Sequence, residues 1–224
     1  MKERPIIFNA DSIQAILDGR KTQTRRVMKP QPPEWVDSWG LTFFTPLGHM
    51  SGRGQYEGHL AEKFFRNPYS TDRLYVREMW TEGYNRPLIE GEGDDENAVS
   101  IIYKDGTEIY RPCPAATAEH WGDFSLDGDL NPIWKSPIFM PRWASRLTLE
   151  IVNVRVERLQ AISGDDVMAE GVDSHVHSDA DYWQRAQVDV FMHYWDTINA
   201  KRGFSWKENP FVGVIEFKPL VRRG

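Results

Sequence analysis

The 224-residue chain contains one cysteine, Cys113. A single cysteine excludes both a disulfide within the chain and a zinc site built from several cysteines. Cys113 stands between two prolines and has no histidine nearby in the sequence, so we expect a packed small residue and not a catalytic thiol. A chain without disulfides suits a reducing compartment, and we expect the protein to be cytoplasmic.

Long apolar runs are also missing. None approaches the roughly 18 residues that cross a bilayer, and the first residues offer only a short apolar stretch before Asn9 and Asp11, unlike a signal peptide. Internal repeats and low-complexity tracts are absent as well. With 40% apolar and 27% charged residues, the composition predicts a soluble globular protein without a membrane partner.

Acidic residues outnumber basic residues, 33 to 27, which gives a formal net charge of −6. This balance excludes an unpatterned, histone-like attraction for nucleic acids, which requires clustered lysines and arginines. Residues 20–29 nevertheless hold five basic residues and no acid, whereas residues 90–96 hold five acids. The basic run is either a solvated face or the basic end of an acidic protein, and the acidic run predicts an exposed loop.

The first thirty residues predict strand, helix, turn and strand, over residues 5–9, 11–18, 19–21 and 22–28. Gly19 is placed to end the helix in a left-handed conformation. Lys21 therefore follows the end of a helix. In the second strand, alternation places Thr22, Thr24 and Arg26 on one face.

Later segments add mainly strands, which we expect over residues 73–78, 99–103, 107–111, 146–159 and 211–218. Asp105-Gly106 between two of them predicts a β-hairpin. Helices are expected over 164–170, capped by Ser163, and over 179–199. This pattern predicts one α+β domain over 1–224, a curled mixed sheet or small barrel with flanking helices. Insertions are expected at about 30–70, which is rich in aromatic residues, and at about 85–140.

The stretch that begins at Gly19 carries a family resemblance. The pattern G-x-K-x-x-T-x-R, formed by Gly19, Lys21, Thr24 and Arg26, resembles the signature of ASCH domains in the PUA-like superfamily. Residues 71–74 resemble the family's G-D-x-L turn, with threonine in place of the glycine; residues 162–171 and 211–217 resemble its short helix ending in Glu and its closing strand. The stretches MPRWASR and INAKRG look like the larger variants carried by bacteriophages and prophages. The resemblance implies a PUA-like mixed β-barrel.

The resemblance also implies a chemistry. Some small ASCH proteins hydrolyse the acetyl amide of N(4)-acetylcytidine with a Lys, a Thr and a Glu, which correspond here to Lys21, Thr24 and Glu170. Lys21 would act as the base, Thr24 as the nucleophile and Glu170 as the acid. The alternatives are a phosphate contact for Lys21, a strand-forming role for Thr24 and a charge partner for Glu170. We expect a metal-independent hydrolase of a nucleoside or RNA, without a cofactor.

Several arginines and one tryptophan could hold a nucleic acid instead. Guanidinium groups bind phosphate through paired hydrogen bonds, and an aromatic ring among them can stack on an unpaired base. The expected partners are RNA, single-stranded nucleic acid or a modified nucleoside. The candidate residues are Arg20, Arg25, Arg26, Arg77, Arg142, Trp143 and Arg146. The alternatives to catalysis are a non-catalytic binding protein and a phage assembly protein, and the pair His175 and His177 is too small a set to predict a metal site.

Overall fold

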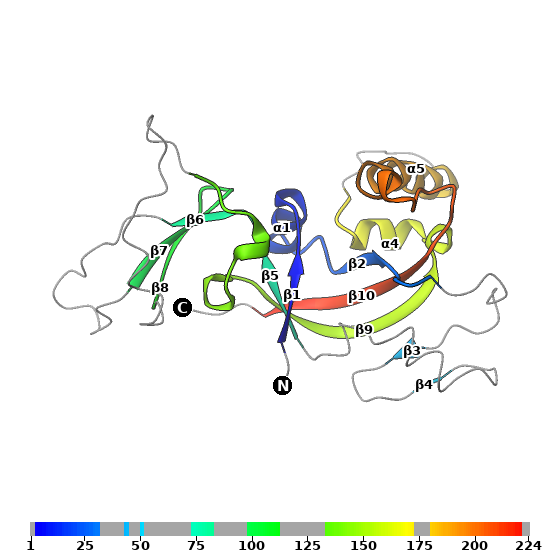
Figure 1. Ribbon diagram of the computed structural model, residues 1–224. Helices are drawn as coiled ribbons and strands as arrows, with labels where there is room; N and C mark the ends of the chain where they lie inside the picture. Colours follow the sequence, from blue (N-terminus) through cyan, green and yellow to red (C-terminus); the bar gives the residue numbers. More distant parts are fainter. Residues whose placement is uncertain are drawn as a thin grey trace. The chain divides into compact units, whose positions relative to one another are not determined.

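The computed structural model describes residues 3–31, 43–44, 50–51, 73–82, 98–112, 133–172 and 180–220 (Figure 1). Most of the two predicted insertions lies outside the described residues, as do Cys113, the acidic run 90–96, His175 and His177. The chain divides into two compact units. Unit 1 comprises Met1–Arg4, Gln14–Leu74 and Leu149–Leu220, and unit 2 comprises Pro5–Ile13, Tyr75–Thr148 and Val221–Gly224.

The described strands form two sheets, which together with the helices confirm the α+β class. The larger, seven-stranded sheet has the order β1 (Glu3–Ile7), β5 (Arg73–Arg77), β9 (Thr148–Arg158), β10 (Phe211–Leu220) and β2 (Gln23–Val27). In addition, β3 (Phe43–Phe44) pairs with β4 (Met50–Ser51) and with β9. The path has β1 and β2 as its ends, so the described strands close no barrel, and the PUA-like barrel stays a prediction.

The predicted N-terminal elements are confirmed to within two residues. Helix α1 (Ala10–Leu17) starts where the backbone N–H of Ser12 donates to the Asn9 side chain at 3.0 Å. It ends two residues before Gly19, which has the left-handed φ of 75° that glycine adopts without a steric penalty. Strand β2 follows and pairs antiparallel with β10.

In unit 1, two helices lie along the same face of β2, β10 and β9 (Figure 1). They are α4 (Gly164–Ala169) and α5 (Ala180–Asn199), with η3 (Leu159–Ala161) before them and η4 (Ala200–Arg202) after them. Alternate residues of β10 face these helices and form a buried apolar cluster with them. The cluster contains Leu159, Ile162, Val167, Phe191, Trp195, Val212 and Val214. Burial of this apolar surface holds α4 and α5 against the sheet.

Unit 2 contains the smaller sheet, in which β7 (Ala98–Tyr103) pairs with both β6 (Trp80–Glu82) and β8 (Glu108–Pro112). The β7–β8 hairpin is confirmed, whereas β6 was not predicted. Two short 3-10 turns follow, η1 (Pro137–Phe139) and η2 (Arg142–Ala144). The buried apolar cluster of this unit contains Trp80, Ile101, Tyr103, Met140 and Ala144. None of the described helices combines the length and the apolarity that a membrane span requires.

Candidate functional site

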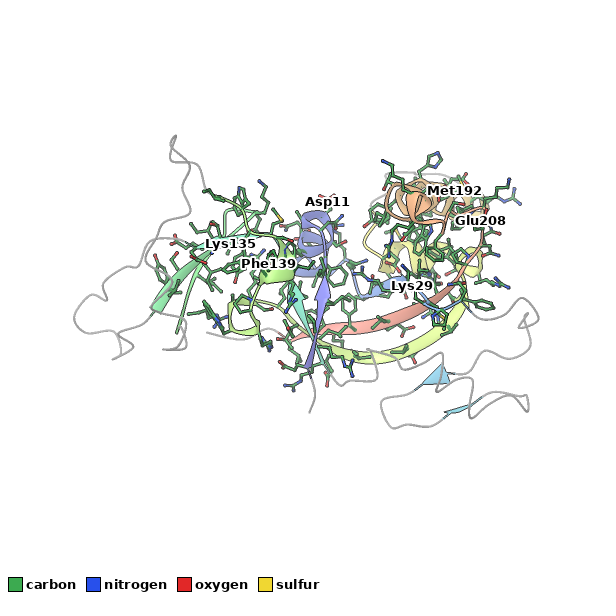
Figure 2. All side chains as sticks on the ribbon, viewed as in Figure 1. Asp11, Lys29, Lys135, Phe139, Met192 and Glu208 are labelled. Carbon is green, nitrogen blue, oxygen red and sulfur yellow. The ribbon has the colours of Figure 1, made fainter. Side chains whose placement is uncertain are left out.

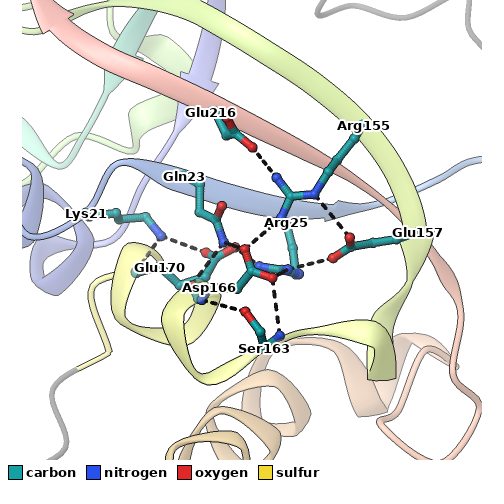
Figure 3. A network of polar contacts seen from close by, with 9 residues as sticks. All are labelled: Lys21, Gln23, Arg25, Arg155, Glu157, Ser163, Asp166, Glu170 and Glu216. Atoms are coloured by element: carbon teal, nitrogen blue, oxygen red, sulfur yellow. Dashed lines mark hydrogen bonds and ion pairs between the residues drawn. The ribbon is translucent and has the colours of Figure 1, made fainter. Parts of the chain in front are cut away.

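The structure brings Lys21 and Glu170 into contact, although 149 positions separate them in the chain (Figure 3). The Lys21 ammonium donates to the Glu170 backbone oxygen at 2.7 Å and to its carboxylate at 2.9 Å. The two residues also form an isolated antiparallel β-bridge. Lys21 is 3% exposed and Glu170 is 6% exposed. This contact is therefore a buried, hydrogen-bonded ion pair.

Local structure at both ends of the pair fixes its geometry. On one side, the backbone N–H of Lys21 donates to the Ala15 carbonyl of α1 at 2.9 Å. On the other side, Glu170 is the C-cap of α4, whose N-terminus is closed by reciprocal hydrogen bonds between Ser163 and Asp166. Two short helices, each with a defined end, thus set the positions of the two charged groups.

Arg25 joins the pair to further carboxylates. Its side chain is fully buried and forms ion pairs with Glu170 at 3.1 Å, Glu157 at 2.6 Å and Asp166 at 3.0 Å. Gln23 donates to the Asp166 carboxylate at 3.0 Å. Side chains of β2, β9 and α4 are therefore connected in one polar network (Figure 3).

Arg155 of β9 extends this network to the neighbouring strand β10. It binds Glu157 at 3.1 Å, Asp166 at 2.7 Å and also Glu216. We call the whole set the ionic cluster: Lys21, Gln23, Arg25, Arg155, Glu157, Asp166, Glu170 and Glu216. It holds three cations and four carboxylates, so it is acidic by one charge, and its cations are matched by acids instead of forming a basic cleft.

Thr24 faces away from the ionic cluster. It pairs with Ile215, while its neighbours Gln23 and Arg25 pair with Glu216 and Val214. Because side chains alternate across a strand, Gln23 and Arg25 point toward α4 and Thr24 points to the opposite face. In the described part of the chain, no hydrogen bond joins the Thr24 hydroxyl to Lys21 or Glu170. The predicted Lys, Thr and Glu site is thus assembled only for its Lys and Glu.

Burial changes the acid–base chemistry of Lys21. Loss of hydration, the largest influence, lowers the pKa of Lys21 below its ordinary 10.5; Glu170 opposes this change, and Arg26 and Arg25 add to it. The neutral amine is therefore reached at a lower pH than for a lysine in water. A neutral amine beside a carboxylate can accept a proton and hand it on, which is what a general base requires.

Asp166 supplies a test of the ionic cluster through pH. Burial alone raises the pKa of Asp166, but Arg25, Gln23, Ser163 and Arg155 outweigh it and lower the pKa from 3.8 to about 2. A depressed carboxyl pKa contributes stability above the unfolded value, and this contribution is lost as the pH falls toward the folded value. The wild-type free energy of unfolding should therefore fall between pH 3.8 and about 2, in part because of Asp166.

In Asp166→Asn, the loss of unfolding free energy that protonation of Asp166 causes should be absent. The free energy of unfolding of this variant should therefore vary less over the same pH range than that of the wild type. Urea titrations at stepwise lower pH measure it. Asp165→Asn is the matched control, because Asp165 is an exposed carboxylate in the same helical turn. Equal pH dependence in Asp166→Asn and wild type would contradict the ion-pair assignment.

The other basic residues predicted near Lys21 occupy different environments. Arg20 is exposed and pairs with Asp18 at 3.0 Å. Arg26 is half-buried and, by strand alternation, shares the face of Thr24. Arg25, which is buried and bound by three carboxylates, offers no guanidinium edge to a phosphate in solvent. The residues predicted to form one basic patch are therefore divided between solvent, the ionic cluster and the opposite face of β2.

The remaining predicted nucleic-acid residues lie in unit 2. Arg146 binds Glu78 through two hydrogen bonds of 2.9 and 2.7 Å and pairs with Asp105 at 2.7 Å. Trp143 is half-buried and packs against the apolar cluster of that unit. Both are therefore engaged within the protein. Arg77 and Arg142 lie near the ring of Tyr75, and Arg142 also donates to the Thr148 hydroxyl at 3.2 Å.

The described residues contain no group of three His, Cys, Asp or Glu side chains that could hold a metal ion. The carboxylates of the ionic cluster are occupied by arginine and lysine. Strand alternation could have identified Gln23 and Arg25 as companions of Lys21. No signal in the sequence selected Arg155, Glu157 or Glu216 as their partners.

In comparisons with known proteins, no family model, no curated protein and no solved structure matches this chain. The ASCH resemblance therefore stays a prediction from motifs. Within the geometry of the site, the buried contact between Lys21 and Glu170 is the feature that offers acid–base chemistry.

Proposed function

We propose that the protein is a metal-independent hydrolase of a modified nucleoside or of RNA, with Lys21 as the general base and Glu170 as its partner. The observation that carries the proposal is the buried Lys21–Glu170 contact together with the lowered pKa of Lys21. Perturbed ionisable groups of this kind concentrate at catalytic sites. A cytoplasmic setting, which the cysteine content favours, and a PUA-like barrel, which the motifs imply, belong to the same proposal.

In the proposed reaction, water is the nucleophile, because Thr24 faces away from the pair. Neutral Lys21 takes a proton from water as its oxygen adds to the carbonyl carbon of an exocyclic amide such as that of N(4)-acetylcytidine. The tetrahedral intermediate then breaks its C–N bond, and the Lys21 ammonium returns the proton to the departing amine. The Glu170 carboxylate stabilises the ammonium between these steps.

RNA cleavage is the other form of the same chemistry. There Lys21 would take the proton of a ribose 2′-hydroxyl, whose oxygen attacks the adjacent phosphorus. The bond between phosphorus and the 5′-oxygen then breaks, the Lys21 ammonium returns the proton to the departing 5′-oxygen, and a 2′,3′-cyclic phosphate remains. The two substrate types share the pair and differ in their products. A panel of acylated nucleosides and short RNAs therefore separates them by the product released.

The decisive variant is Lys21→Met, which removes the base and keeps an apolar stem of similar length. We expect its kcat to fall by roughly 10²- to 10⁴-fold, the usual contribution of a general base. The measurement is acetate or oligonucleotide release in the presence of a chelator. Lys201→Ala, which removes an exposed lysine, is the control and should retain full activity.

Thr24→Val tests the choice of nucleophile, since it removes the hydroxyl and keeps the shape. Activity should persist in this variant, and a loss as large as that of Lys21→Met would return the nucleophile role to Thr24. The kcat/KM of the wild type should also rise with pH through a pKa below 10.5, as the direction of the Lys21 shift requires.

Fold integrity is checked by near-UV circular dichroism, because Lys21→Met leaves Glu170 paired with Arg25 alone. A folded Lys21→Met protein with wild-type turnover would exclude the proposal. Salt-dependent binding of oligonucleotides without turnover of any substrate would favour the non-catalytic binding protein instead.

A further inference from the structure

The 3-10 turn η1 in unit 2, which carries the Phe139 labelled in Figure 2, contains no buried residue. Phe139 is 74% exposed and Ile138 is 59% exposed, and Phe139 is the most exposed of the large apolar side chains in the described ranges. Contiguous apolar surface that is exposed to water and bordered by polar groups is typical of binding sites. The turn therefore has the properties of a contact surface.

A cation lies directly beside this turn. Arg77 donates to the Ile138 carbonyl at 2.9 Å and to the Tyr75 hydroxyl at 3.1 Å. Its guanidinium carbon lies 5.4 Å from the centre of the Tyr75 ring, and that of Arg142 lies 5.1 Å from the same centre. One buried aromatic ring thus holds two guanidinium groups. One of them, Arg77, is hydrogen-bonded to the backbone of Ile138, the residue that precedes the exposed Phe139.

The charge of Arg77 is not compensated by any acid among the described residues. Both of its acceptors are neutral groups, and none of the ion pairs found in that part of the chain involves it. This differs from Arg25 and Arg146, which are each bound by carboxylates. A half-buried cation whose acceptors are neutral favours an anionic ligand, and guanidinium groups match phosphate through paired hydrogen bonds.

We propose that Tyr75, Arg77, Ile138, Phe139 and Arg142 form a binding surface for a single-stranded nucleic acid. Arg77 and Arg142 hold a backbone phosphate, and Phe139 stacks on a base. The inference rests on the proposed function in one respect, because both assume a nucleic-acid ligand. It goes further by assigning strand binding to unit 2 and by adding Phe139, which the sequence did not single out.

An exposed aromatic ring beside guanidinium groups is the combination that single strands require. Base stacking tolerates any sequence because every base has an aromatic face, and the phosphate contact adds charge neutralisation. Duplexes keep their bases stacked on one another, so they cannot use Phe139 in this way. The surface should therefore prefer single strands to duplexes of the same length.

The experiment is fluorescence anisotropy with labelled 12-nucleotide oligouridylate, oligoadenylate and oligothymidylate, with the full chain as titrant. Phe139→Ala should weaken binding by roughly ten- to a hundredfold with an unchanged salt dependence. Phe139→Trp should bind with an affinity similar to that of the wild type, because a tryptophan ring can also stack on a base. Arg77→Gln should weaken binding and lower the slope of log K against log salt by about 0.7, the value for one phosphate of a single strand.

Ile133→Ala is the matched control, because Ile133 is an exposed apolar residue of the same unit that lies outside the proposed surface. RNA and DNA probes show whether the 2′-hydroxyl contributes. Unchanged affinity in both Phe139→Ala and Arg77→Gln would overturn the inference. The inference would also fail if the wild type bound no oligonucleotide, whether or not Phe139→Ala dissociates a dimer in sedimentation runs.

The two proposals fail separately. If oligonucleotide binding depended on Phe139 but no substrate were turned over, the hydrolase proposal would be excluded and the proposed binding surface would stand. If a free nucleoside were turned over but Phe139→Ala had no effect on oligonucleotide affinity, the binding surface would be excluded and the hydrolase proposal would stand.

Discussion

Replacing Arg25 with alanine should lower the free energy of unfolding by about 3–5 kcal/mol, the usual cost of breaking a buried ion pair by removing one partner. The Arg25 side chain is fully buried and contacts the carboxylates of Glu157, Asp166 and Glu170. Without it, the ionic cluster would hold two cations and four carboxylates. Like charges would then repel one another in a place that water reaches poorly.

Urea denaturation at neutral pH measures this loss, and Arg20→Ala is the control. Arg20 lies in the same basic run, but its side chain is 43% exposed and its ion pair is with Asp18, so removing it should cost at most about 1 kcal/mol. The gap between Arg25→Ala and wild type should narrow as the pH is lowered, because protonation removes the repulsion among the carboxylates. A loss below about 1 kcal/mol for Arg25→Ala would show that the ionic cluster does not hold unit 1 together.

The local structure of this region follows from local sequence signals. Gly19 ends α1, Ser163 and Asp166 close the N-terminus of α4, and Asp105-Gly106 turns the β7–β8 hairpin. Each signal acts over a few residues, through backbone conformations that only certain side chains support. The contact between Lys21 and Glu170 came from the family resemblance, because nothing local links positions so far apart.

The face occupied by Thr24 could have been predicted. Alternation in β2 separates Thr24 and Arg26 from Gln23 and Arg25, and the register with β10 shows the same division. A site that combines Lys21 with Thr24 conflicts with that period of two. Strand alternation therefore argues against Thr24 as the nucleophile, a role that only the family resemblance implies.

The partners of the arginines could not be predicted. Arg25 and Arg146 were expected to face a ligand, but each is matched by carboxylates from other elements. A sequence shows that a residue is charged and does not show which acids tertiary folding brings beside it. Phe139 was missed for the opposite reason, since aromatic residues are usually buried and only the three-dimensional structure shows one in solvent.

Gly171→Ala should destabilise the protein by roughly 2–5 kcal/mol, from about 1–2 for the left-handed backbone and about 1–3 for overpacking. Gly171 has φ 74° and directly follows Glu170. A Cβ at this position would lie 2.8 Å from the Cβ atoms of both Ala15 and Lys21. These atoms are attached directly to backbone and cannot rotate away, so α1 and the Lys21 segment would have to move from α4.

Gly19→Ala separates the two contributions. Gly19 has nearly the same φ, 75°, but a methyl group added there would meet no heavy atom within 4 Å, so its replacement should cost only the backbone strain of about 1–2 kcal/mol. The excess loss in Gly171→Ala, measured by urea denaturation, reports the close approach of Gly171 to Lys21. Because a displacement of about 1 Å at a catalytic group can reduce a rate by 10²-fold, Gly171→Ala should also lose turnover at temperatures where it remains folded. Equal stability losses in the two variants would show that the chain relaxes around the added methyl group without disturbing Lys21.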